Sequence, residues 1–183
     1  PTDDDIRRTI GKTLEDSFAL LTGVTDAGRL AEFRRQYVKE ADGCMTANTV
    51  LFPETAGVLR RLKAAGARVG IISTKYRYRI RELLVARGLD DVFDIIVGGE
   101  DVSAAKPSPE GVLMALDRLQ VSREEVLYVG DSAVDAETAR AAGVSFAGVT
   151  HGVTTAEELS AYPHRLVMDS LESLLPDAGT AEK

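Results

Sequence analysis

The feature that most constrains the fold is a series of five short apolar runs that alternate with helix-like segments from Glu54 onward. The runs lie at 68–72, 93–97, 126–129, 144–149 and 165–168. They are apolar throughout rather than alternating with polar residues, which indicates strands buried on both faces of a parallel sheet. The segments between them carry apolar residues at helical spacing. The pattern predicts an α/β fold with a doubly wound, Rossmann-like parallel sheet.

The N-terminal part has a different pattern. Apolar residues recur at helical spacing over 2–22, with a break near Gly11, and again over 26–41, and nothing in this part resembles a strand. Residues 46–53 have the composition of a linker. We therefore predict a small α-helical cap over 1–49 and an α/β core over 50–183, with residues 177–183 as a frayed tail.

Composition narrows the classes of partner and compartment. Twenty-two Lys and Arg against 29 Asp and Glu give a net charge of −7, which disfavours nucleic acid or an anionic membrane as the main partner. The single cysteine, Cys44, excludes an intramolecular disulfide and a thiolate-rich metal site. No apolar stretch approaches the length of about 18 residues that a membrane span needs. We expect a cytoplasmic monomer or homodimer that acts on a small molecule.

Polar residues follow three of the predicted strands, where a ligand site is expected in an open parallel sheet. Hydroxyls can donate to phosphate oxygens, an ammonium neutralises their charge, and a carboxylate holds Mg²⁺. Taken singly, such residues are more often helix caps or solvated loop residues. The prediction of a phosphate site therefore depends on their occurrence together after successive strands. The candidates are Ser73, Thr74 and Lys75 after the first run, Lys106 after the second, and Asp131, Ser132 and Asp135 after the third.

Three segments resemble motifs of the haloacid dehalogenase-like hydrolase superfamily, and most of all its phosphoglycolate phosphatase-like branch, which has a helical cap. They are IISTK (71–75), KPSPE (106–110) and YVGDSAVD (128–135). The resemblance implies that Ser73 binds the transferring phosphoryl group, that Lys106 stabilises its charge and that Asp131 ligates Mg²⁺. Asp135 and Ser132 would orient these groups.

Residues around the phosphoryl site would contact the rest of the substrate. Thr74 and Lys75 follow Ser73 directly, and the resemblance places Gly11 and Lys12 in a cap loop that closes over the active site. The ordinary alternative for Gly11 and Lys12 is a helix break beside an exposed lysine.

One motif of the superfamily is missing from this pattern. The resemblance implies a first, central strand that ends in Asp-x-Asp and supplies the nucleophile, but the chain's only Asp-x-Asp is Asp3–Asp5, at the start of a predicted helix. There, acidic residues complement the helix dipole. We expect either that a nucleophile-bearing strand precedes residue 1 in the natural protein or that the chain is catalytically silent. The 183-residue chain itself is expected to be inactive.

Four basic residues follow the first run. Lys75 and Arg77 could share in anion binding at the start of the next helix. Arg79 and Arg81 are expected to lie on a solvated face of that helix.

Other polar residues are weaker candidates for the active site. His151 follows the fourth run and could touch substrate, although a plain loop position is the more common outcome. His164 and Cys44 lack a recognisable catalytic partner. Glu100 and Asp101 are expected to cap a helix, to lie in a solvated loop or to flank the metal.

The sequence thus favours a Mg²⁺-dependent phosphatase that hydrolyses a small phosphate monoester, such as phosphoglycolate, through an aspartyl-phosphate intermediate. A pyrophosphatase or a sugar-phosphate mutase of the same superfamily is an alternative, although such mutases tend to carry Glu where this chain has Gly130. A non-catalytic domain that binds Mg²⁺ and a phosphometabolite is the alternative from another class.

Overall fold

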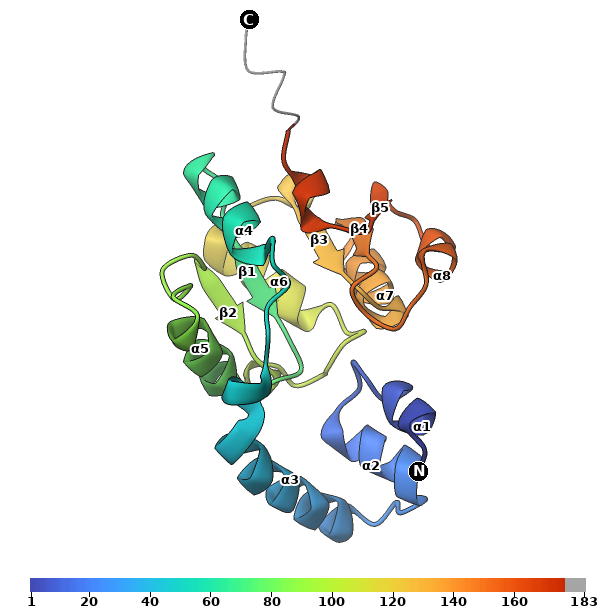
Figure 1. Cartoon of the computed structure of the whole chain (residues 1–183). Helices are drawn as coiled ribbons and strands as arrows, with labels where there is room; N and C mark the ends of the chain where they lie inside the picture. Colours follow the sequence, from blue (N-terminus) through green and yellow to red (C-terminus); the bar gives the residue numbers. More distant parts are fainter. Residues whose placement is uncertain (177–183) are drawn as a thin grey trace, which may run out of the picture.

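The computed structural model describes residues 1–176 and consists of a helical part followed by an α/β part (Figure 1). The helical part contains α1 (Asp3–Arg7), α2 (Leu14–Thr22) and α3 (Ala27–Asn48). Gly11 has a φ of +90° and lies in the turn between α1 and α2, which confirms the predicted break. None of the helices within residues 1–176 is both long and apolar enough to cross a bilayer.

The α/β part contains all five predicted strands, with slightly different ends. Helices lie between successive strands, as a parallel sheet requires. The strands are β1 (Gly70–Ile72), β2 (Ile95–Val97), β3 (Leu127–Gly130), β4 (Ser145–Val149) and β5 (Leu166–Met168). The α-helices are α4 (Thr55–Ala64), α5 (Arg77–Ala86), α6 (Glu110–Leu119), α7 (Ala133–Ala142) and α8 (Ala156–Ser160). Single-turn 3₁₀ helices occur at Gly99–Asp101, Arg123–Glu125 and Leu171–Leu174.

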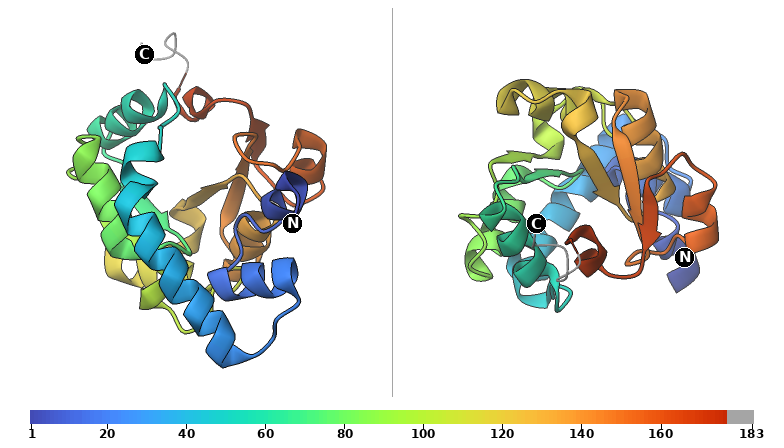
Figure 2. Two further views of the ribbon diagram at one scale, coloured as in Figure 1. Left: turned by 60° about the horizontal axis from the view of Figure 1, so that its bottom comes forward. Right: turned by 90° about the horizontal axis from the view of Figure 1, so that it is seen from above.

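The strands form two parallel sheets rather than one. β1 pairs with β2, and β4 pairs with both β3 and β5. Figures 1 and 2 show the two sheets side by side, with β1 and β3 as the facing strands. Within residues 1–176 no strand pairs with the second edge of β1 or of β3. The predicted α/β class is therefore confirmed, but the predicted continuous sheet is divided between β1 and β3.

Apolar packing joins the two sheets on one face. Ile72 of β1 packs against the cluster that contains Tyr128 of β3, and α6 contributes Val112 and Leu116 to the same cluster. The opposite face of β1 and β2 is covered by α4 and α5, through contacts that include Ile71. The helices on both faces therefore bring the carboxyl ends of the strands in both sheets to one side of the molecule.

Helix α3 is longer than predicted. The apolar spacing predicted an end at residue 41, and the next residues, Asp42 and Gly43, are poor helix formers. In the structure the Asp42 carboxylate accepts hydrogen bonds from Tyr78 and Arg79 of α5, and the helix continues to Asn48. A tertiary contact thus overrides the local preference, and the connection to α4 begins at Thr49.

Candidate active site

The segments after β1 and β2 approach each other closely at the carboxyl ends of the strands. Ser73 accepts a hydrogen bond at Oγ from the backbone N–H of Lys75 (3.1 Å). A Cβ atom at position 99 would lie 2.5 Å from the carbonyl oxygen of Thr74, so only glycine fits there. Ser73, Thr74 and Lys106 line one pocket of about 20 Å³, enough for a single water molecule. The structure therefore brings these three predicted residues together.

Lys106 links this pocket to the end of β3. Its Nζ lies 2.7 Å from Oδ1 of Asp135, and both side chains are largely buried. Ser132 donates its hydroxyl proton to the other carboxylate oxygen of Asp135 (2.6 Å), and the Tyr128 hydroxyl lies 3.3 Å from Oδ1. Asp135 is thus held on three sides, which fits the expectation that it orients its neighbours.

Asp131 and Asp135 have opposite electrostatic environments. Burial raises the pKa of the Asp131 carboxyl above its usual range, and the neighbouring charge of Asp135 raises it further. Burial also acts to raise the pKa of Asp135, but the charge of Lys106 and the hydrogen bonds from Lys106, Ser132 and Tyr128 together outweigh it, and that pKa is lowered. Asp135 is therefore a stable carboxylate, while the positive charge of Lys106 compensates only part of the cost of ionising Asp131.

Two glycines allow the close packing around these carboxylates. A Cβ atom on Gly130 would lie 2.2 Å from Cβ of Asp135. A Cβ atom on Gly152 would lie 2.4 Å from Oδ2 of Asp131. Gly152 could not be identified from the sequence, because a glycine after a strand is common and only the fold places it against Asp131.

The environment of Asp131 fits a cation only in part. A half-buried carboxylate whose negative form is disfavoured by a second carboxylate would be stabilised by a bound divalent ion. However, residues 1–176 contain no group of three or more His, Cys, Asp or Glu side chains that could hold a metal by themselves. Asp131 can therefore supply one Mg²⁺ ligand, and further oxygen ligands are needed.

The turn between α1 and α2 reaches the same side of the α/β part. A Cβ atom on Gly11 would lie 3.9 Å from Oγ of Ser132, so the turn between α1 and α2 is close to the end of β3. Lys12, next to Gly11, makes no side-chain hydrogen bond or ion pair with residues 1–176. Lys75 lies elsewhere and borders a wider cavity of about 400 Å³ along α3. The structure therefore brings Gly11, but not Lys75, to the residues around Asp135.

Two of the three arginines after β1 differ from the prediction. The Arg77 guanidinium donates to Asp101 (2.6 Å), so this residue closes the loop after β2 rather than facing an anion. Arg79 is only 9% exposed and pairs with Asp42 of α3 (2.7 Å), so the expectation of a solvated side chain was wrong. Arg81 is exposed, as predicted. The acidic partners could not be identified because they come from distant parts of the chain.

Glu100 and Asp101 are loop-closing residues in this structure. The Glu100 carboxylate accepts hydrogen bonds from the backbone N–H of Arg77 (2.9 and 3.0 Å). Asp101 accepts one from the backbone N–H of Gly98 (2.8 Å). Of their three predicted roles, capping is therefore the one that the contacts support.

His151 forms a contact that the sequence did not indicate. Its ring stacks on Phe52 with a centroid distance of 3.8 Å, and its Nε2 lies 3.2 Å from Oε1 of Glu54. These contacts join the segment before α4 to the end of β4. His164 is exposed, and its Nδ1 lies 2.7 Å from the Tyr162 carbonyl oxygen. Cys44 is exposed on α3.

Comparison with known proteins identifies the family. A family model for haloacid dehalogenase-like hydrolases matches residues 1–149. The chain belongs to the haloacid dehalogenase-like hydrolase family. The three segments that suggested this resemblance all lie within the matched region, and they contain the residues that the fold gathers around Lys106 and Asp135.

Relatives of this haloacid dehalogenase-like hydrolase include phosphatases. A phosphoglycolate phosphatase from Salmonella typhimurium is 36% identical over 131 residues, which cover 72% of this chain and 52% of that protein. The chain thus spans about half the length of that relative. A crystal structure described as a haloacid dehalogenase-like hydrolase from Bacteroides fragilis is 60% identical, with a TM-score of 0.93 over 96% of this chain and 83% of that one. A structure described as a β-phosphoglucomutase from Thermotoga maritima is 25% identical, with a TM-score of 0.74 over 95% and 82% of the two chains.

Proposed function

We propose that this haloacid dehalogenase-like hydrolase is the principal part of a Mg²⁺-dependent phosphatase for a small phosphate monoester such as phosphoglycolate. The observation that carries the proposal is the joint placement of Ser73, Thr74 and Lys106 around one pocket, with Lys106 tied to Asp135 beside Asp131. Hydroxyl donors, an ammonium and a carboxylate that can hold a cation are the groups that phosphoryl transfer needs. Similarity to phosphoglycolate phosphatases supports the substrate class.

Each residue has a role that follows from its position. The Ser73 hydroxyl donates to a phosphoryl oxygen, and the Lys106 ammonium balances the negative charge of the phosphoryl oxygens during transfer. Asp135 keeps Lys106 in place, since it holds Nζ at 2.7 Å. Asp131 would hold Mg²⁺, which supplies further charge neutralisation at the phosphate when bound. Gly11 and Lys12 would cover the site and exclude water.

The proposed reaction needs an aspartate that residues 1–176 do not place at this site. By family resemblance that residue ends a strand between β1 and β3, and the structure has an unpaired strand edge on each side of that position. The carboxylate oxygen would attack phosphorus as the ester P–O bond breaks, and the leaving oxygen would take a proton. Water would then attack the phosphorus of the aspartyl phosphate, releasing inorganic phosphate and regenerating the carboxylate.

A complementation experiment tests the proposal. Phosphate release from phosphoglycolate is measured in Mg²⁺ with the 183-residue chain alone and with an added peptide that carries the Asp-x-Asp strand of a phosphoglycolate phosphatase. We expect turnover only with the peptide, and none when the first aspartate of the peptide is replaced by asparagine. A peptide that binds to the chain but produces no turnover would instead favour the non-catalytic, phosphate-binding alternative.

Product analysis separates the related enzyme classes. The structural similarity to a β-phosphoglucomutase keeps phosphoryl transfer within a sugar as the second candidate. Phosphorus NMR of reactions with phosphoglycolate, glucose 1-phosphate and pyrophosphate distinguishes release of phosphate from isomerisation. We expect hydrolysis of phosphoglycolate to dominate.

The proposal also covers the cellular compartment, the partners and the domain organisation. The acidic net charge and the single cysteine support a cytoplasmic enzyme that acts on a small phosphorylated metabolite, without nucleic acid or membrane as a partner. The proposed division remains a cap over 1–49 and a core from residue 50, acting as a monomer or homodimer.

A further inference from the structure

The contact between the cap and the core is concentrated along two helices, α3 and α5. Arg34 of α3 lies over the ring of Tyr76, just before α5, with 5.1 Å between Cζ and the ring centroid. Farther along, Arg87 after α5 donates to the carbonyl oxygen of Thr49, just after α3 (2.6 Å). Both arginines are at least partly exposed. These two contacts lie at opposite ends of the helix pair.

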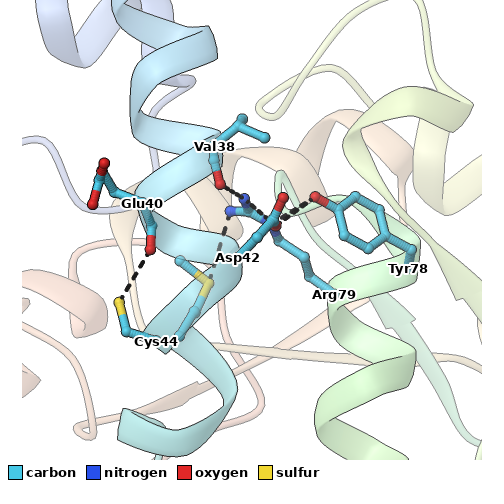
Figure 3. Close-up of polar contacts among 7 residues, drawn as sticks. Val38, Glu40, Asp42, Cys44, Tyr78 and Arg79 are labelled. Atoms are coloured by element: carbon cyan, nitrogen blue, oxygen red, sulfur yellow. Dashed lines mark hydrogen bonds and ion pairs between the residues drawn. The ribbon is translucent and has the colours of Figure 1, made fainter.

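Arg79 lies between these two contacts and is the buried member of the set. It is only 9% exposed, and its Nη2 donates to Asp42 Oδ1 (2.7 Å) and to the Val38 carbonyl oxygen (2.9 Å). Its Nε lies 3.0 Å from the same Asp42 oxygen and 2.9 Å from the Tyr78 hydroxyl, which itself donates to Asp42 (2.8 Å). Figure 3 shows these side chains between the two helices, with Glu40 and Cys44 on the other side of α3.

Breaking some of the hydrogen bonds of Arg79 while it stays buried is costly. A guanidinium that is buried against a helix loses much of its hydration, so its donors need the carboxylate and carbonyl acceptors that α3 supplies. The planar group also fixes the direction of each hydrogen bond, which a lysine could not do. Arg79 therefore favours one position of α3 on the core over neighbouring positions.

The position of α3 determines where the rest of the cap lies. α2 is attached to α3 through the Phe18 ring, whose centroid lies 5.7 Å from that of Phe33 and 6.1 Å from that of Tyr37. The turn that contains Gly11 precedes α2 and reaches the core beside Ser132. A change in the position of α3 would therefore move Gly11 relative to the phosphate-binding residues.

We propose that Arg79 is a positioning residue, which through Asp42 fixes α3 on α5 and so holds the cap over the site formed by Lys106, Ser132 and Asp135. The placement of the cap follows from the contacts alone. Its consequence for turnover rests on the proposed function. Arg79 does not touch the site residues itself, so its effect is indirect.

A distance measurement between cap and core tests the placement. Spin labels at Leu20→Cys on α2 and Arg140→Cys on α7, both exposed, report the separation by pulsed electron paramagnetic resonance in a Cys44→Ser background. We expect a single narrow distance distribution in the parent chain. Arg79→Met and Asp42→Asn should each broaden it and shift it to longer distances.

Three comparisons make the result decisive. Arg81→Met, on the exposed side of the same helix, should leave the distribution unchanged, and Arg79→Lys should restore it in part. Adding Asp42→Asn to Arg79→Met should have no further effect, because the two residues act through one contact. Asp42 is about half exposed, so its variant should fold even where Arg79→Met does not. Parent-like distributions in cooperatively folded Arg79→Met and Asp42→Asn would overturn the proposal.

The effect on turnover is measured separately, in the peptide-complemented chain. If Arg79 positions the cap, Arg79→Met and Asp42→Asn should each raise the KM for phosphoglycolate more than they lower kcat, while Arg81→Met changes neither. A lack of turnover in the parent chain would count against the proposed function only, and the distance result would still decide the role of Arg79.

Discussion

The ammonium of Lys106 lies 2.7 Å from the carboxylate of Asp135, and both side chains are at most 15% exposed. This ion pair connects the segment after β2 with the segment after β3, which belong to different sheets. It therefore holds the two halves of the site together as well as lowering the pKa of Asp135.

Replacing one partner of this pair should be costly. Lys106→Met leaves the Asp135 carboxylate buried beside Asp131 without a cation, and removal of one partner of a buried pair usually costs about 3–5 kcal/mol. Urea unfolding should show a loss of this size. Lys106→Met combined with Asp135→Asn should recover part of it, since the uncompensated charge is then removed. A loss below about 0.5 kcal/mol for Lys106→Met would contradict this account.

Asp131 should determine the response of the chain to Mg²⁺. A ligand that binds only the folded state at 100 times its dissociation constant stabilises it by about 2.7 kcal/mol. We expect Mg²⁺ to raise the melting temperature of the parent chain and to have no effect on Asp131→Ala. Asp90→Ala removes an exposed carboxylate and serves as the control. An equal Mg²⁺ response in Asp131→Ala would exclude Asp131 as a ligand.

Two glycine substitutions should change stability in opposite directions. Gly130→Ala forces a Cβ atom against the Asp135 side chain, and such overpacking costs typically about 1–3 kcal/mol. Gly57 lies in α4, and a Cβ atom added there would meet no neighbouring group within 4 Å. Gly57→Ala should therefore stabilise the fold by about 0.5–1 kcal/mol. Thermal unfolding measures both. Similar effects of the two substitutions would show that the contact with Asp135 is not tight.

Acid should loosen the contact between α3 and α5. Hydrogen bonds from Tyr78 and Arg79 lower the pKa of the Asp42 carboxyl, so its contribution is present above the unfolded-state pKa of about 3.9 and is lost as the pH falls through the lower folded-state value. The cap-to-core distance should therefore be constant from about pH 7 to 5 and increase below about pH 4. Asp42→Asn should remove this pH dependence, and a parent-like acid response in that variant would assign it to other groups.

The sequence predicted the strands because burial on both faces leaves a continuous apolar run, as at 144–149. It also predicted that Ser73, Lys106 and Asp135 lie together, because the carboxyl ends of parallel strands share one edge of a sheet. It failed for Arg79 and for the end of α3 for a single reason. The contact between Arg79 and Asp42 joins residues 37 positions apart, and local patterns contain no information on such a pair.

The two facing edges of β1 and β3 have a consequence for how the stability of this chain should be understood. A strand that inserts between them would complete hydrogen-bonded ladders on both of its sides, so that binding and the final step of folding become one event. By mass action, the free energy of unfolding would then rise with the logarithm of the concentration of that strand. When the strand is covalently attached, its effective concentration is set by the length of the connection rather than by the experimenter. The stability of the same 183 residues would then depend on how that strand is supplied.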